Sequence, residues 1–157
     1  MRRFKQQLPD AEVRQILTRA THGVLSLADE QGTPYGVPMS FVYDGGRTIY
    51  FHGARAGHKM ECLRSNSRAS FCVVALDEVQ PAEFTTYYRS AVVSGGIAEV
   101  TGHDERMTAL RMLGDKYAPG HDSRAEIAKG WEQVAVVRLE IETMSGKEAI
   151  ELTRQRQ

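Results

Sequence analysis

Residues 37–63 read VPMSFVYDGGRTIYFHGARAGHKMECL, a succession of strand, turn, strand and helix signals that decides the fold. Apolar and β-branched residues predict strands over Tyr35–Tyr43 and Thr48–His52, and the DGG turn at 44–46 predicts that they form a hairpin. Pro38 has no N–H to donate to a sheet ladder, so its strand is expected to be an edge or irregular there. Small and basic residues follow, and a helix is expected to begin near Gly57.

The rest of the chain predicts more strands and a few helices around that hairpin. Further strands are expected at Val24–Ala28, Ala69–Leu76, Tyr87–Val100 and Ala135–Thr143. Helices are expected at Pro9–Ala20, Asp104–Tyr117 and Ser123–Gln133. The Gly95-Gly96 pair predicts a bend or bulge in its strand. Six strands joined mostly by short turns indicate a mainly β fold with peripheral helices (α+β), built on an antiparallel sheet closed as a small barrel.

Length and composition limit the class of protein. A chain of 157 residues suits a single domain over 1–157. Lys plus Arg equals Asp plus Glu at 20 each, which disfavours a nucleic-acid partner. No stretch has the length and apolarity of a membrane span or the core of a signal peptide, so a cytoplasmic location is expected. Cys62 and Cys72 match no disulfide scaffold or zinc spacing and are predicted to be reduced, mostly buried thiols.

The common catalytic motifs are missing from the sequence. It holds no G-x-G-x-x-G after a strand, no P-loop, no H-E-x-x-H and no G-x-S-x-G. The five histidines are scattered, and His52 and His58 have no acidic or cysteine partner at ligand spacing, so no metal site is predicted.

The start of the helix near Gly57 is a candidate anion site. The first N–H groups of a helix have no intrahelical partner and carry partial positive charge, which suits a phosphate. Gly57 allows close approach to the backbone, while His58, Lys59 and the preceding Arg55 add donors. The alternative is a solvated basic turn. His52 likewise is either a hydrogen-bonded side chain at a strand end or a functional group at the mouth of that site.

Three segments together resemble one family. VPMSFVYDGGRTIYFHGARAGHKMECLRSNSRASFCV (37–73), YYRSAVVSGGIAEV (87–100) and VVRLEIETMSGKEA (136–149) are similar to the pyridoxamine 5′-phosphate oxidase-like flavoproteins, in particular to the branch with nitroimidazole-resistance proteins. The resemblance runs from about Val24 to Ala149. It implies a split β-barrel that forms a homodimer and binds FMN in clefts at the subunit interface.

The resemblance also implies roles for individual residues. Val37, Pro38, Met39 and Ser40 would line the flavin ring, and His52, Gly53 and Ala54 would lie along the cofactor. His58 and Lys59 would hold the phosphate, and Tyr88 and Ser90 would approach from a strand of the other subunit. His52 is the candidate catalytic residue. Residues 144–147, Met-Ser-Gly-Lys, look like the closing M-T-G-K motif of the branch.

Two departures from the family argue against oxidation of pyridoxamine phosphate. The true oxidases carry a basic residue where this chain has Tyr35–Met39, and they have a longer C-terminal segment with an arginine. The expected function is therefore an FMN-dependent oxidoreductase that passes electrons from NAD(P)H to a small acceptor such as a nitroaromatic or a quinone.

Two other functions stay open. The same barrel could be a non-catalytic protein that stores or senses a flavin, a deazaflavin or haem, with His52 as the axial ligand of haem. A barrel that binds single-stranded nucleic acid would use strand aromatics such as Phe41, Tyr43, Tyr50 and Tyr87, but the balanced charge disfavours it.

Overall fold

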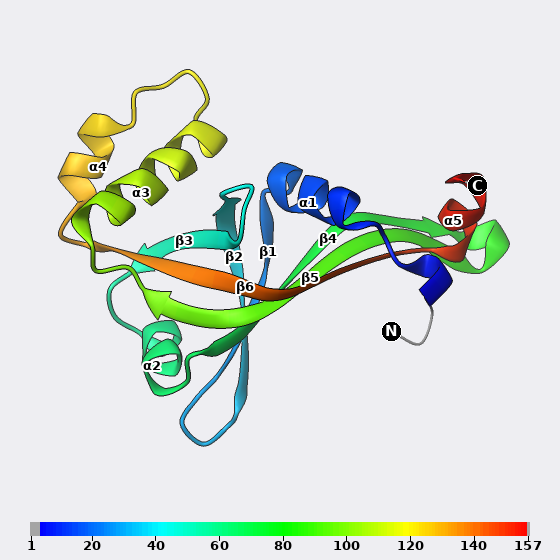
Figure 1. Ribbon diagram of the computed structural model, residues 1–157, viewed down its shortest axis with the longest axis horizontal. Helices are drawn as coiled ribbons and strands as arrows, with labels where there is room; N and C mark the ends of the chain where they lie inside the picture. Colours follow the sequence, from blue (N-terminus) through cyan, green and yellow to red (C-terminus); the bar gives the residue numbers. More distant parts are fainter. Residues whose placement is uncertain (1–3, 157) are drawn as a thin grey trace.

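The computed structural model describes residues 4–156 (Figure 1). The strands are β1 (His22–Ala28), β2 (Pro34–Tyr43), β3 (Thr48–Ala54), β4 (Arg68–Gln80), β5 (Thr85–Glu99) and β6 (Val134–Glu148). The helices are α1 (Asp10–Arg19), α2 (His58–Ser65), α3 (His103–Tyr117), α4 (Arg124–Gly130) and α5 (Ile150–Arg156), with short 3-10 turns at Phe4–Gln6 and Pro81–Glu83. Within this part of the chain, no helix is both long and apolar enough to cross a membrane.

The strands form one antiparallel barrel. They hydrogen-bond in the order β1-β2-β3-β6-β5-β4, and β4 pairs back with β1. Inward-facing side chains such as Phe41, Phe51 and Phe71 are completely buried, and the Phe71 ring lies edge-on to both of the others. The predicted mainly β, antiparallel architecture with peripheral helices is confirmed.

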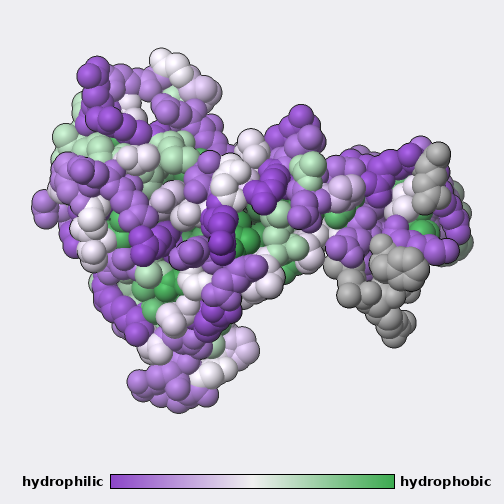
Figure 2. Space-filling view, viewed as in Figure 1, coloured by the Kyte–Doolittle hydropathy of each residue, from purple (hydrophilic) through white to green (hydrophobic). Residues whose placement is uncertain are grey.

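The helices cover different sides of the barrel. In Figure 1, α3 and α4 lie on one side, α2 lies on the opposite side, and α1 lies against the region where the long strands leave the barrel. A second apolar cluster packs α3 and α4 against outward-facing residues of the wall, among them Val42 and Val136. Figure 2 shows hydrophobic surface over the barrel between α2 and the α3–α4 pair.

The barrel wall opens between β2 and β3. These strands pair only where Phe41–Tyr43 meets Ile49–Phe51. Residues 34–40 of β2 continue beside β1 alone, while residues 52–54 of β3 continue beside β6. Pro38 faces Val24 of β1 and has no partner strand on its other side, which confirms the predicted edge position. We call this divergence of β2 and β3 the split.

Three strands continue beyond the barrel as an arm. The pairing of β4 with β5 runs out to Gln80 and Thr85, and β6 follows β5 as far as Glu148 (Figure 1). The predicted strands Ala69–Leu76, Tyr87–Val100 and Ala135–Thr143 are therefore too short at the arm end, and α5 was not predicted. The expected irregularity at Gly95-Gly96 is confirmed, since the β5–β6 register shifts between Ser94 and Gly95.

Buried charge secures the arm. Glu148 is fully buried, accepts a hydrogen bond from Arg89 Nε at 3.1 Å, and lies 3.0 Å from Arg156 of α5. Gln6 Nε2 donates to the Glu148 carbonyl at 3.1 Å. Both cysteines are free: Cys62 is buried and Cys72 is partly buried.

Candidate functional site

The split is bordered by the start of α2. Gly57 caps this helix with φ 109°, a backbone conformation that side chains disfavour. Its carbonyl accepts the N–H groups of Met60 and Glu61 at 2.9 and 3.2 Å. The N–H groups of His58 and Lys59 precede the first intrahelical bond and are the donors that a helix start offers to a ligand.

Lys59 reaches from α2 into the split. Its Nζ lies 3.7 Å from Met39 Sδ on β2, and a Cβ added to Gly53 on β3 would stand 2.4 Å from the same Nζ. Partial burial lowers the pKa of Lys59. Within residues 4–156 no carboxylate lies within ion-pair distance of this ammonium, whose hydrogen-bond partner is a weakly accepting thioether. A partly buried charge without a counter-ion is unfavourable, so the split offers a cation without a partner in the described chain.

His52 lies on β3 beside the split, on the outer face of the wall. Its side chain keeps contact with solvent, yet the surrounding protein partly buries it and lowers its pKa, and the Lys59 charge lowers that pKa further. The imidazole is therefore mainly neutral at pH 7 and can donate one hydrogen bond and accept another.

The other predicted residues along β2 and β3 divide between the two faces. Val37 is half-buried and Met39 is buried, both toward the barrel core, whereas Pro38 and Ser40 are exposed. This alternation is the period of two expected of a strand. On β3, Gly53 lies against Lys59 and Ala54 is exposed. The structure thus brings the predicted residues Met39, Gly53 and Lys59 together, and it places Ser40 and His52 on one neighbouring hollow.

The His58 imidazole points away from the split, unlike the Lys59 side chain. Its ring lies edge-on to Tyr35 with centroids 4.6 Å apart, Nδ1 is 3.5 Å from Glu61, and Nε2 is 3.6 Å from Cys62 Sγ. The surrounding hollow also includes the carboxylates of Asp29 and Glu30, whose negative charge would repel a phosphate. Among residues 4–156 no group of three or more His, Cys, Asp or Glu is placed to hold a metal ion.

Tyr88 and Ser90 lie far from the split within one chain. Ser90 pairs with Lys147 on β6, whereas His52 pairs with Val136 on the same strand. Positions 136 and 147 are separated by roughly 36 Å of strand, given about 3.3 Å of rise per residue. The Tyr88 ring lies 5.6 Å from Lys147 Nζ, so the two residues belong to the arm and not to the opening in the same protomer.

A cavity of about 480 Å³ adjoins Ser40 and His52 under the α3–α4 pair. Its lining is otherwise drawn from α3, from the segment through α4, and from the start of β6: Leu110, Leu113, Gly114, Tyr117, Ser123, Glu126, Ile127, Gly130 and Val134. Most of these side chains are apolar, and none was predicted as a site residue. The helices that carry them were predicted, but their packing over β2 and β3 is tertiary and leaves no local sequence signal.

Tyr117 is a further residue that sequence reasoning missed. Its hydroxyl accepts a hydrogen bond from the Phe41 N–H at 2.8 Å and is hydrogen-bonded to the carbonyl of Thr21, with the Phe41 carbonyl 2.9 Å away. Two of these contacts are with the backbone of Phe41 in β2, near the point where β3 departs, and the third is with Thr21 just before β1. Tyr117 thereby holds α3 over the split.

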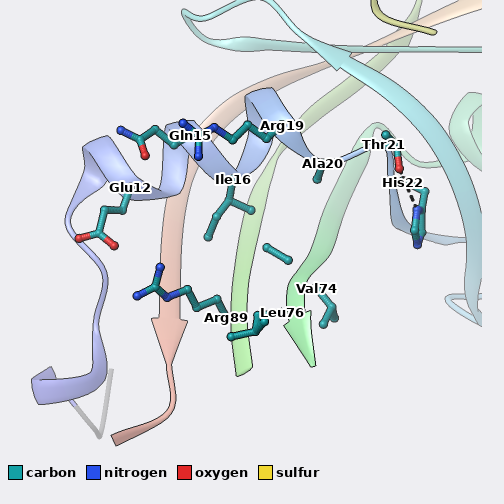
Figure 3. A pocket seen from close by; sticks show the side chains of 11 residues that line it. Glu12, Gln15, Ile16, Arg19, Ala20, Thr21, His22, Val74, Leu76 and Arg89 are labelled. Carbon is teal, nitrogen blue, oxygen red and sulfur yellow. Dashed lines mark hydrogen bonds between the residues drawn. The ribbon is translucent and has the colours of Figure 1, made fainter. Parts of the chain in front are cut away.

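A second cavity, of about 490 Å³, lies between α1 and the root of the arm (Figure 3). Figure 3 shows Arg89 extending from β5 toward the α1 side of this cavity, with Ile16 above the sheet. None of the predicted site residues lines it. Residues 144–147 flank α1 as well: a Cβ on Gly146 would stand 2.5 Å from Val13, so this glycine lets α1 pack on β6.

Comparison with known proteins identifies a family and several solved structures of similar fold. The family model described as pyridoxamine 5′-phosphate oxidase matches residues 9–148. A candidate 5-nitroimidazole antibiotic resistance protein of Bacteroides thetaiotaomicron is 23% identical, with TM-score 0.77 over 90% of this chain and 86% of its own. An FAD-binding protein of Mesorhizobium loti is 29% identical, with TM-score 0.67 over 92% of this chain and 97% of its own.

A third similar structure, the FAD and haem binding protein of Mycobacterium smegmatis, is 24% identical, with TM-score 0.77 over 92% of this chain and 73% of its own. Among curated proteins, none matches the chain in sequence.

Proposed function

This chain belongs to the pyridoxamine 5′-phosphate oxidase family, and from that premise we propose that it binds FMN and passes electrons from NAD(P)H to a small oxidised acceptor of nitroaromatic or quinone type. The support from similar proteins is that structures of the same fold include an FAD-binding protein and a protein linked to nitroimidazole resistance. Fold alone does not determine a reaction, so the residues at the split carry the proposal.

The single observation that carries it is the ammonium of Lys59. It lies between Met39 and Gly53 with no carboxylate partner among the described residues, beside the free N–H groups at the start of α2. A phosphate monoester is a near-dianion that would accept from all three donors. We assign this phosphate role to Lys59 and to the backbone of His58. The His58 imidazole is directed elsewhere.

The rest of the cofactor would follow the two diverging strands. Val37, Pro38, Met39 and Ser40 would line the ring from β2, and His52, Gly53 and Ala54 would lie along the cofactor from β3. Lys59 fits the terminal phosphate of FMN, and an FAD pyrophosphate would have to place an internal phosphate there. FMN is therefore the proposed form.

A homodimer completes this proposal, because Tyr88 and Ser90 cannot reach the split of their own chain. The arm carries exposed apolar side chains that a partner would cover: Val74, Val79 and Val92 are 59%, 68% and 40% exposed, and Phe84 at the tip is 99% exposed. Soluble proteins rarely leave such groups together without a partner. A second copy would supply Tyr88 and Ser90 to the neighbouring cofactor site.

The chemistry follows from the groups beside the split. Bound FMN supplies the capacity to accept a hydride and return electrons to an acceptor. Reduction of a quinone to a hydroquinone consumes two electrons and two protons, of which NAD(P)H supplies both electrons and one proton. His52 stands at the outer mouth with a neutral imidazole, so it can donate its N–H to an acceptor oxygen and relay the second proton from water.

Oxidation of pyridoxamine phosphate is a less suitable reaction. Residues 35–39 of β2 carry no lysine or arginine, so this strand offers no cation to a second phosphate. The cytoplasm is the compartment that we assign, since free Cys62 and Cys72 suit a reducing environment.

A carrier or sensor without catalysis is the alternative. The flavocytochrome Anf3 of Azotobacter vinelandii and the FAD and haem binding protein of Mycobacterium smegmatis have the same fold as this chain. A neutral His52 would also suit an axial ligand. The absorption spectrum of the purified protein, with the released chromophore identified by mass, distinguishes flavin, deazaflavin and haem.

Turnover then distinguishes an enzyme from a carrier. The FMN-loaded protein should oxidise NAD(P)H when a nitroaromatic or quinone is present, and His52→Ala should lower kcat by about 10²–10⁴-fold while FMN stays bound. His103→Ala, on the exposed start of α3, is the matched control. Full turnover of His52→Ala would remove His52 from catalysis.

A further inference from the structure

We propose that the cavity beneath α3 and α4 is a binding site for an uncharged, planar aromatic molecule, which enters beside His52. That this molecule is the electron acceptor rests on the function proposed above. That the cavity binds such a molecule does not, because the lining alone supports it.

The lining of the cavity is largely apolar. Leu113 is 5% exposed and Leu110 and Ile127 are 9% exposed, and all three belong to the apolar cluster that packs α3 and α4 on the barrel. Val134 closes the side toward β6. Such walls retain a ligand by removing its apolar surface from water. A volume of about 480 Å³ lies within the range of small-molecule sites and suits one or two aromatic rings.

Helix contacts hold the cavity open in one shape. A Cβ on Gly114 would stand 2.7 Å from Ser123, so the chain before α4 lies almost on the backbone of α3 at this end. Tyr117, the last residue of α3, is held by backbone groups of Phe41 in β2 and of Thr21, which precedes β1. Its hydroxyl is committed to those bonds, and the ring forms a wall.

The polar groups of the lining select against charge. Ser40 and His52 both line the cavity on the side of the split, where each can hydrogen-bond a polar substituent of a ligand. Glu126 is the one carboxylate, and no lysine or arginine appears in the described lining. An anionic ligand would enter without a cation and next to a negative charge, whereas an uncharged one would not.

This cavity is separate from the proposed phosphate site at Lys59. Successive residues of a strand point to opposite faces, so His52 and Ser40 face the cavity while Gly53 and Met39 face Lys59. One opening in the wall therefore has a cationic inner side and an apolar outer side. The phosphate of a cofactor and an uncharged acceptor could each use one side.

The test uses a pair of glycine variants and one uncharged probe, methyl 4-nitrobenzoate. A Cβ at Gly130, which lines the cavity, would have no heavy atom within 4 Å, so Gly130→Leu adds bulk to the lining without a clash at Cβ. Gly102, at the start of α3, is equally open and outside the lining, so Gly102→Leu is the matched control. Isothermal titration of the flavin-free protein should show binding that Gly130→Leu weakens by about tenfold or more and Gly102→Leu leaves unchanged.

A charged analogue tests the selectivity. The 4-nitrobenzoate anion should bind about tenfold more weakly than its ester, and Glu126→Gln should narrow that difference by about two- to threefold. In the wild-type protein the ester should shift the methyl NMR signals of Leu113 and Ile127 and leave unmoved those of Leu8, which precedes α1, and of Val13, within α1. This second measurement applies even if a variant fails to fold.

The outcomes separate the two proposals. If the ester binds and Gly130→Leu blocks it while FMN does not bind, the cavity proposal holds and the flavin function fails. If the ester binds equally to Gly130→Leu, or if the anion binds as tightly as the ester, the cavity proposal is wrong.

Discussion

Glu148 in the arm is fully buried and Lys59 at the split is partly buried, and the two charged groups differ in what surrounds them. Glu148 is fully buried between Arg89 and Arg156, so its charge is neutralised by the protein itself. Lys59 is partly buried against Met39 and Gly53 with no carboxylate beside it in the described chain. The Glu148 charge is therefore satisfied within the protein, whereas the Lys59 charge has neither a carboxylate nor an aromatic face beside it among the described residues, unlike Lys116, whose ammonium lies 4.1 Å from the centre of the Phe41 ring.

The largest expected effect comes from breaking the paired charge. Glu148→Ala leaves two arginines facing each other in the arm, and we expect the free energy of unfolding in urea to fall by about 2–4 kcal/mol. The exposed Glu140→Ala serves as control and should change stability by less than about 0.5 kcal/mol. Equal effects of the two variants would mean that the Glu148 pairs contribute nothing.

The same experiment on Lys59 should give the opposite sign. Lys59→Met removes a charge that the flavin-free protein leaves without a counter-ion, so unfolding should be unchanged or require up to about 1 kcal/mol more. Lys5→Met, on the exposed N-terminal 3-10 turn, makes the same change in net charge as a control. A loss of stability in Lys59→Met alone would show that the ammonium has a structural partner.

A smaller effect is expected from moving the ammonium without removing it. In Gly53→Ala the new Cβ would stand 2.4 Å from Lys59 Nζ, so the flexible end of the lysine must shift. FMN affinity, measured by titration, should fall by about three- to tenfold, since a displaced charge-assisted bond is weakened and not lost. Gly102→Ala, at an open position, should bind FMN as the wild type does.

The smallest effect concerns the pKa of His52. Burial lowers it first and the Lys59 charge second, so in Lys59→Met the His52 pKa should rise and yet stay below its ordinary value. In wild type the unfolded chain binds the proton more readily, so this group favours folding above the ordinary pKa of histidine and does so less as pH falls. An NMR titration of the His52 ring protons measures this pKa. If the His52 pKa does not change in Lys59→Met, the Lys59 ammonium lies too far from the imidazole to affect it.

Local sequence rules predicted the parts of the fold that depend on near neighbours. The hairpin around residues 44–46, the edge position of Pro38 and the irregularity at Gly95-Gly96 follow from turn chemistry, a missing N–H and glycine in a strand. The start of α2 after Gly57 was predicted for the same reason. Each of these signals lies within a few residues of the structure that it specifies.

The parts that could not be predicted depend on distant contacts. The arm strands carry exposed apolar and polar residues such as Val74 and Asp77. These residues form a strand because they pair with β5, and they show no alternation of buried and exposed side chains that would mark a strand in the sequence. The Tyr117 hydroxyl meets Phe41, 76 positions away in sequence, and no local pattern marks it. The direction of the His58 ring depends on Tyr35, which only the folded barrel brings near.

The candidate site shows the same division. The spacing of residues 52–59 predicted an anion site, and the fold brings Lys59 into the split. The cavity lined by Leu113 and Ile127, by contrast, exists only because α3 and α4 pack over β2 and β3. A glycine-rich basic turn is visible in a sequence, whereas an apolar cavity between helices looks like ordinary core residues.

The central claim is that the Lys59 ammonium receives a phosphate, and the most direct test compares FMN with riboflavin, which lacks that group. Wild-type protein should bind FMN about ten- to a hundredfold more tightly than riboflavin by isothermal titration, and Lys59→Met should abolish that preference while riboflavin affinity stays the same. A preference for FMN that survives in Lys59→Met, or wild-type protein that binds the two flavins equally, would contradict the claim.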